Sequence, residues 1–261
     1  MDRMYALPKD NELYEGDKMR RVDNPELKRK VLDHLANLYG IREVREPNHL
    51  SSYVYCRTKS FLDQKATALP NDDEVLMFAL GYGLQDVLTP KDANTPLVNK
   101  YGIIYRPDMS FTVKDPAMSS PSIITTAPLA TMHELEQLVE IKTTRRSAKN
   151  HYMDEYIPQT WLDYMMGGCT MIETNEYDLI VLYLMGNYSP PFPQIYCDTF
   201  YFNSEELEAN WAKILERKEV LDKSLETGKP PTSFQNCYDW ECDYCRYVLV
   251  CNTLVTVLEE V

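Results

Sequence analysis

The most informative residues in this chain are LVEIKTT, residues 138–144. The stretch is apolar enough to form a short buried strand, and it carries Glu140 two residues before Lys142. Side chains alternate between the faces of a strand, so Glu140 and Lys142 project to one side while Val139 and Ile141 hold the strand in the core. A carboxylate binds a hard cation, and a neighbouring lysine can orient water or neutralise charge on phosphorus. Most isolated pairs of this kind are solvated strand charges, so further residues must support a site.

A second acid, Asp108, precedes this strand. Residues 98–112 are typical of a strand pair, with Asp108 near the end of the second strand. Residues 114–133 contain three prolines and many Ser and Thr residues, which predict a long excursion before the strand of Glu140. Two carboxylates and a lysine on neighbouring strands are a suitable environment for a divalent cation.

The remaining pattern alternates helices with short strands. It predicts an α/β fold in which a small mixed sheet is flanked by helices. Helices are expected over residues 24–39, over a short segment carrying Cys56, and over 71–88, 154–166 and 203–226. Strands are expected over 177–185 and 195–202. Gly167 and Gly168 are expected to end the fourth helix.

Composition limits the classes of function. The 261 residues carry a formal net charge of −13, which argues against a general binder of polyanions. Positive charge is concentrated in KTTRRSAK, residues 142–149, where Arg145, Arg146 and Lys149 follow Lys142 and are candidates for phosphate contact. The N-terminus has no apolar leader, and the longest apolar run, 179–185, is too short for a membrane span, so the cytoplasm is the expected location.

Cysteines are concentrated near the C-terminus. The run CDYCRYVLVC, residues 242–251, places three cysteines in C-x2-C-x5-C spacing. Tetrahedral zinc and four-iron clusters usually have four thiolate ligands, so a fourth cysteine is expected. Cys237 would complete a local site, whereas Cys56 would close the site across the whole fold.

The acidic residues resemble a known nuclease pattern. Arg106-Pro107-Asp108 followed by Glu140-Ile141-Lys142 is similar to the core of the PD-(D/E)xK nuclease superfamily. The resemblance implies that Asp108 and Glu140 bind Mg²⁺ or Mn²⁺ and that Lys142 is catalytic.

Two further elements resemble the RecB-like branch of this superfamily. That branch has a Gly-x-x-x-His run on the preceding helix, and here GYGLQ, residues 81–85, places Gln85 where the histidine ligand stands. The branch also carries Gln and Tyr on the helix after the lysine, which implies catalytic roles for Gln159 and Tyr164 in holding substrate or Lys142.

The segment SYVYCRTKSFL, residues 52–62, is similar to the first-cysteine motif of the iron–sulfur RecB-like nucleases, which include the CRISPR-associated exonuclease family. This resemblance implies one nuclease domain over residues 1–261, with an iron–sulfur module formed by about 50–62 together with 230–261. The implied ligands of a structural 4Fe–4S cluster are Cys56, Cys242, Cys245 and Cys251.

The implied activity is metal-dependent hydrolysis of DNA, as an exonuclease on single-stranded ends. The implied setting is CRISPR spacer acquisition beside the integrase proteins, or a viral or plasmid copy of the enzyme. No membrane association is expected, and the oligomeric state stays open. Two alternatives also stay open, a catalytically degenerate subunit that binds DNA or supports assembly, and a zinc-stapled interaction module.

Overall fold

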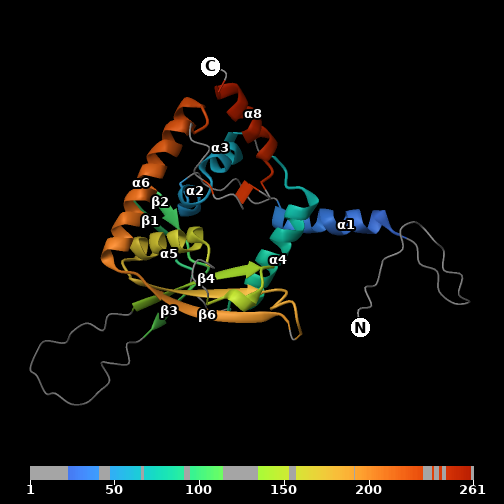
Figure 1. Cartoon of the computed structure of the whole chain (residues 1–261), viewed down its shortest axis with the longest axis horizontal. Helices are drawn as coiled ribbons and strands as arrows, with labels where there is room; N and C mark the ends of the chain where they lie inside the picture. Colours follow the sequence, from blue (N-terminus) through green and yellow to red (C-terminus); the bar gives the residue numbers. More distant parts are fainter. Residues whose placement is uncertain are drawn as a thin grey trace, which may run out of the picture.

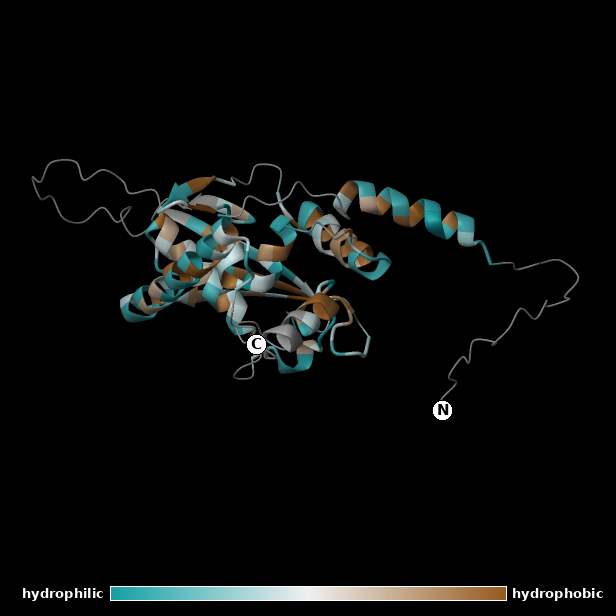
Figure 2. Cartoon of the chain, turned by 90° about the horizontal axis from the view of Figure 1, so that it is seen from above, coloured by the Kyte–Doolittle hydropathy of each residue, from teal (hydrophilic) through white to brown (hydrophobic). Residues whose placement is uncertain are grey.

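The computed structural model describes residues 23–40, 48–65, 68–90, 95–113, 135–152, 157–190, 192–231, 237, 241–242 and 245–259. Helices lie above one small sheet, and α1 extends away from the rest of the molecule in both views (Figures 1 and 2). The α-helices are α1 (Pro25–Leu35), α2 (Leu50–Val54), α3 (Arg57–Lys65), α4 (Asp72–Leu88), α5 (Gln159–Ile172), α6 (Ser204–Thr227) and α8 (Val248–Glu259). A π-helical turn η1 (Ala36–Gly40) continues α1, and a 3₁₀ turn η3 (Ala148–Asn150) follows β4.

The sheet is mixed, as expected for this fold class. Its strands are β3 (Met109–Val113), β4 (Leu135–Thr144), β5 (Glu176–Tyr183) and β6 (Gln194–Tyr201), in the order β3-β4-β5-β6. The pairs β3–β4 and β5–β6 are antiparallel, whereas β4 and β5 are parallel. Parallel neighbours need a crossover connection, and α5 lies in that connection. A separate hairpin pairs β1 (Val98–Lys100) with β2 (Ile103–Tyr105).

Side-chain caps set the starts of the two long helices. Asn71 accepts a hydrogen bond from the backbone N–H of Glu74, whose carboxylate accepts from the Asn71 N–H. Asn203 and Glu206 make the same reciprocal pair at the start of α6. Each capping box satisfies backbone donors that have no partner within the helix, so both helices begin where the sequence predicts.

The main core is unusually rich in tyrosine. It joins α2, α5 and the inner face of the sheet, and the rings of Tyr53, Tyr105, Tyr177 and Tyr183 are at most 1% exposed. Val139 and Ile141 instead join Met109 in a small cluster on the other face of β4. Strand β4 is therefore buried on both faces, which holds Glu140 and Lys142 on one side, as expected.

Three local predictions were wrong. Residues 98–112 form β1, β2 and the start of β3 rather than one strand pair, and Asp108 stands just before β3 instead of near a strand end. Pro107 has no N–H for a ladder hydrogen bond, so β2 stops at Tyr105 and the chain then pairs with β4.

Cys56 was expected on a helix but lies between α2 and α3. Its N–H donates to the carboxylate of Glu241 at 2.9 Å rather than to a helical carbonyl. The carbonyl of Ser52, its helical partner position, accepts from the Ser60 hydroxyl instead. A tertiary contact thus replaces a helical hydrogen bond at this cysteine.

The expected end of the fourth helix at Gly167 and Gly168 was also wrong. Helix α5 runs through both glycines to Ile172. A Cβ atom on Gly168 would lie 2.6 Å from the Tyr105 hydroxyl and 2.9 Å from the Tyr177 ring, so this glycine allows a close approach of the helix to the two rings.

Within the described parts of the chain, no helix combines the length and apolar character needed to cross a membrane.

Gly168→Ala should lower the free energy of unfolding by about 1–3 kcal/mol, because the added methyl group overpacks two buried rings. Gly83→Ala in α4 is the matched control. Its Cβ would lie 3.6 Å from the Tyr39 hydroxyl, an ordinary contact. Replacing a helical glycine with alanine should then stabilise by about 0.5–1 kcal/mol. Urea denaturation followed by circular dichroism measures both variants, and equal stabilities would contradict the packing explanation.

Candidate functional site

Pairing of β3 with β4 brings the two acids together. Met109 is in register with Val139, so Asp108 arrives beside the centre of β4. One carboxylate oxygen of Asp108 accepts a hydrogen bond from the backbone N–H of Ile141 at 2.8 Å. Because Ile141 directly follows Glu140, the Asp108 carboxylate lies one peptide unit from the second acid.

Glu140 is a buried carboxylate, only 3% exposed, and forms an ion pair with Lys142. Burial raises the pKa of Glu140 to about 7, and the negative charge of Asp108 adds to the effect while Lys142 opposes it. Burial alone would lower the pKa of Lys142, but the charges of Glu140, Tyr55 and Asp108 raise it above its ordinary value. Lys142 therefore stays an ammonium ion that donates hydrogen bonds and does not accept a proton.

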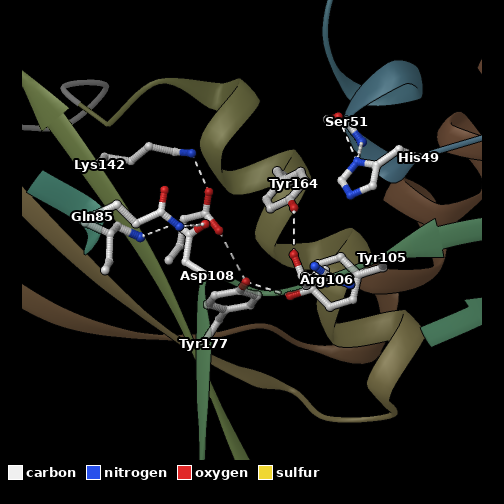
Figure 3. Close-up of polar contacts among 11 residues, drawn as sticks. His49, Ser51, Gln85, Tyr105, Arg106, Asp108, Lys142, Tyr164 and Tyr177 are labelled. Atoms are coloured by element: carbon white, nitrogen blue, oxygen red, sulfur yellow. Dashed lines mark hydrogen bonds and ion pairs between the residues drawn. The ribbon is translucent and has the colours of Figure 1, made fainter. Parts of the chain in front are cut away.

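Two tyrosines support Glu140 from the core. The Tyr177 hydroxyl donates to Glu140 Oε2 at 3.5 Å and lies 2.6 Å from the Tyr105 hydroxyl. Burial raises the pKa of Tyr177 and of Tyr105 well above the ordinary value, so both hydroxyls remain protonated. Since Tyr177 uses its proton on Glu140, Tyr105 is the donor between the two hydroxyls. Figure 3 shows the hydroxyls of Tyr105 and Tyr177 joined to each other, with Tyr177 close to Asp108.

Gln85 and Tyr164 also reach this site. The amide nitrogen of Gln85 donates to the second carboxylate oxygen of Asp108 at 2.7 Å. Lys142 Nζ lies 5.7 Å from the centre of the Tyr164 ring, a cation–π arrangement. The Tyr164 hydroxyl donates to the Arg106 carbonyl at 3.4 Å. Figure 3 shows Gln85 and Lys142 directed toward the region of Asp108.

These residues form the floor of a cleft of about 970 Å³. The residues from β4, α5 and the segment before β3 are mainly polar, whereas α4 contributes a largely apolar wall. The lining comprises His49, Ser51, Tyr55, Met77, Phe78, Gly81, Tyr82, Gln85, Thr95, Leu97, Ile104, Arg106, Pro107, Asp108, Glu140, Ile141, Lys142, Thr143 and Tyr164.

Gln159 is not brought to the cleft. It stands exposed at the start of α5, and its amide donates to Asp163 of the same helix at 2.9 Å. Asp163 also pairs with Lys213 of α6. The spacing of Gln159 and Tyr164 on one helix places them on different faces, since residues five apart are rotated by about 500°.

The basic residues Arg145, Arg146 and Lys149 follow the end of β4 and are exposed. None of the three lines the described cleft, which begins beside them at Lys142 and Thr143. Their proposed role in contacting phosphate is therefore not part of the cleft itself.

Cys56 lies within electrostatic range of cysteines near the C-terminus. The sulfur atoms of Cys237 and Cys242 lie 3.4 Å apart. Burial raises the pKa of Cys237, and Cys56 and Cys242 raise it further. Burial also raises the pKa of Cys251 to about 11, with further contributions from Cys245, Cys56 and Cys242. Cys56 and Cys237 thus each interact electrostatically with cysteines of the C-terminal triad, and both remain candidates for the fourth ligand.

Arg246 connects this cysteine group to the wall of the cleft. Its guanidinium pairs with the buried Glu74 of α4 at 3.1 Å and donates to the Ala68 carbonyl at 2.7 Å. The same group lies 6.0 Å from the centre of the Phe78 ring. Sequence reasoning missed Arg246 and the two tyrosines behind Glu140, because their spacing in the chain gives no sign of these contacts.

Among the described residues, no group of three or more His, Cys, Asp or Glu side chains is arranged to hold a metal ion. The donor types nevertheless fit the expected ligands. Two carboxylates close together in a buried site lack full charge compensation, which a divalent cation provides, and Gln85 adds an amide oxygen. The cysteine set offers thiolates of the kind that hold iron–sulfur clusters or zinc, and does not distinguish between them.

Comparison with known proteins gave a distant structural likeness. No family model matches the chain, and no curated protein matches it. A solved structure described as "Crystal structure of SSO0001" is 17% identical, with a TM-score of 0.48. The match covers 86% of this chain and 96% of that one.

The raised pKa of Glu140 predicts a pH dependence of stability in metal-free protein. Between the ordinary carboxyl pKa of 4.5 and the folded value of about 7, the native state binds more protons than the unfolded state. The free energy of unfolding should therefore fall as pH rises through this interval, by about 3 kcal/mol from this group.

Glu140→Gln should remove this component of the pH dependence, whereas Glu205→Gln, at an exposed position in α6, should retain it. Urea denaturation in the presence of EDTA at several pH values measures the slopes. Identical slopes for wild type and Glu140→Gln would show that the carboxyl group titrates normally.

Proposed function

We propose that this protein is a metal-dependent DNA nuclease of the PD-(D/E)xK type that acts on single-stranded ends. The observation that supports it most strongly is the meeting of Asp108, which directly precedes β3, with Glu140 and Lys142 of β4 in the lining of one cleft. Hydrolysis of a phosphodiester needs a bound cation, an oriented water molecule and compensation of charge on phosphorus, and these residues suit all three tasks.

Each residue has a distinct role in this proposal. Asp108 and Glu140 would hold Mg²⁺ or Mn²⁺, with Gln85 as a further ligand. The bound cation supplies Lewis-acid activation of the phosphate and of water. Lys142, which stays protonated, donates a hydrogen bond to the attacking water or to a phosphate oxygen and stabilises the developing negative charge. Tyr164 holds the Lys142 ammonium against its ring.

The proposal includes a structural 4Fe–4S cluster held by Cys56, Cys242, Cys245 and Cys251. The cluster would link the segment after α2 to the segment before α8, where the Cys56 N–H already bonds Glu241. In this proposal the protein would trim DNA beside CRISPR integrase proteins, or would be a viral or plasmid copy of such an enzyme.

A second function, binding DNA without cleaving it, is favoured by one observation. Both carboxylate oxygens of Asp108 already accept hydrogen bonds, one from Gln85 and one from Ile141. This arrangement satisfies the acid without a cation, as in a catalytically degenerate subunit.

Lys142→Ala should abolish cleavage of a labelled single-stranded oligodeoxynucleotide in Mg²⁺ or Mn²⁺ while the protein stays folded. Glu140 tolerates the loss of its partner because its raised pKa allows it to bind a proton instead. Lys229→Ala, at an exposed site after α6, is the matched control and should cleave normally. Gel analysis of products, with circular dichroism as the folding check, gives the result.

Metal titration separates the two functions. Mn²⁺ should raise the melting temperature of wild type at pH 8, and Asp108→Asn should lose that response. Wild type that binds DNA but neither responds to Mn²⁺ nor cleaves would support the degenerate subunit instead.

Cys56→Ala should lose the iron, the sulfide and the brown colour of anaerobically purified protein, since a cluster with one ligand missing is labile. Cys197→Ala on the exposed side of β6 should keep all three. Cys237→Ala should also keep them if Cys56 is the fourth ligand. Iron and sulfide analysis together with visible absorbance measures each variant, and stoichiometric zinc in wild type would replace the iron–sulfur proposal.

A further inference from the structure

The α4 side of the cleft has a different chemical character from the acidic floor. Phe78 and Tyr82 line the cleft from this helix, and Gln85, which bonds Asp108, continues the same row. Residues at these spacings share one helix face. At 1.5 Å per residue, Tyr82 lies about 5 Å and Phe78 about 10 Å along the axis from Gln85. An aromatic surface therefore begins one helical turn from the acids.

These rings do not belong to the cores formed by the described residues. Both are half-buried, and neither is a member of the two clusters that pack around the sheet. Both side chains instead line the cleft.

The aromatic wall is held in place from behind. Tyr39 of η1 stacks on Tyr82, with ring centres 6.4 Å apart and ring planes within 20°. The ring centres of Phe78 and Tyr82 are 6.1 Å apart, and the Arg246 guanidinium carbon lies 6.0 Å from the centre of the Phe78 ring. Because these contacts fix the rings before a ligand arrives, little conformational entropy is lost on binding.

Gly81 keeps the wall open between the rings and the floor. It lines the cleft, and a Cβ atom built on it would already lie 4.0 Å from the Thr143 hydroxyl of β4. A larger side chain at this position would fill the space between α4 and the end of β4. The cations nearby, Lys142 and the exposed Arg106, give this part of the cleft the charge that a phosphate needs.

We propose that Tyr82 and Phe78 form a stacking subsite for an unpaired nucleobase, belonging to a nucleotide next to the phosphate at Asp108, Glu140 and Lys142. This inference rests on the proposed function and names its substrate more closely. Stacking on aromatic side chains accepts any base and contributes about 1–3 kcal/mol per base. A paired base is already stacked within its duplex, so the subsite selects single-stranded DNA.

Binding of short fluorescent oligodeoxynucleotides by the full chain in EDTA tests the subsite, because no cleavage then occurs. The probes are a normal strand and a strand of equal length that keeps the sugar–phosphate backbone but lacks the bases. Wild type should bind the normal strand about 5- to 100-fold more tightly, the ratio that one stacked base provides. Fluorescence anisotropy measures both affinities.

Tyr82→Ala should abolish this preference, and Tyr82→Phe should keep it, since stacking needs the ring and not the hydroxyl. Gly81→Leu keeps both rings but fills the space between α4 and the end of β4. This variant should also lose the preference for the normal strand. Tyr201→Ala on β6, a 70% exposed tyrosine outside the cleft lining, is the matched control and should behave as wild type. Thermal denaturation of each variant shows whether it is folded.

The subsite and the nuclease activity can fail separately. Equal binding of normal and abasic strands by wild type, or a preference that survives both Tyr82→Ala and Gly81→Leu, overturns the stacking subsite even if Mn²⁺-dependent cleavage is found. A base preference that depends on Tyr82, in a protein that does not cleave DNA with Mg²⁺ or Mn²⁺, supports the subsite and refutes only the nuclease proposal.

Discussion

A charged carboxylate removed from water needs compensation, and Glu140 imposes that requirement on the centre of this structure. Lys142 supplies an opposite charge, Tyr177 supplies a hydrogen bond, and Asp108 adds a second negative charge beside it. The position of Asp108 follows from the register of β3 on β4, and that of Tyr177 from the parallel pairing of β4 with β5. Gly168 in turn lets α5 approach the tyrosine pair closely. The Glu140 carboxyl group thus has its surroundings set by the pairing of the strands, by the tyrosine-rich core and by the glycine in α5.

Helix α4 contacts the three parts of the molecule that the proposals involve. Its first turn holds Glu74, which pairs with Arg246 next to Cys245. Its middle presents Phe78 and Tyr82 to the cleft, and its last turns present Gln85 to Asp108. A buried ion pair is costly to break from one side, so the cysteine group and the cleft wall are mechanically joined through Arg246. Any group that orders the cysteines therefore also steadies the wall on which we place the nucleobase.

Local patterns predicted the elements well where a local cause operates. The capping residues Asn71 and Asn203 marked the starts of α4 and α6, and alternation along β4 placed Glu140 and Lys142 on one side. The predicted helix bounds were wrong where a contact with a residue distant in the sequence outweighed the local pattern. Gly167 and Gly168 suggested a helix end, but the packing of Tyr105 required a glycine inside the helix. The segment around Cys56 was predicted to be helical, but the Cys56 N–H donates to the carboxylate of Glu241, which is distant in the sequence.

The linear chain was sufficient to select the candidate residues for the proposed function: two acids, a lysine, a basic run and a group of cysteines, all recognisable by residue type and spacing. Their assembly was not accessible from the chain alone. Three results come from packing. Gln85 reaches Asp108 while Gln159 bonds Asp163. Cys56 interacts with Cys237, and the Arg246 guanidinium lies near the Phe78 ring. The reason is physical: residue type and periodicity express local geometry, whereas these contacts depend on which faces of remote elements are buried together.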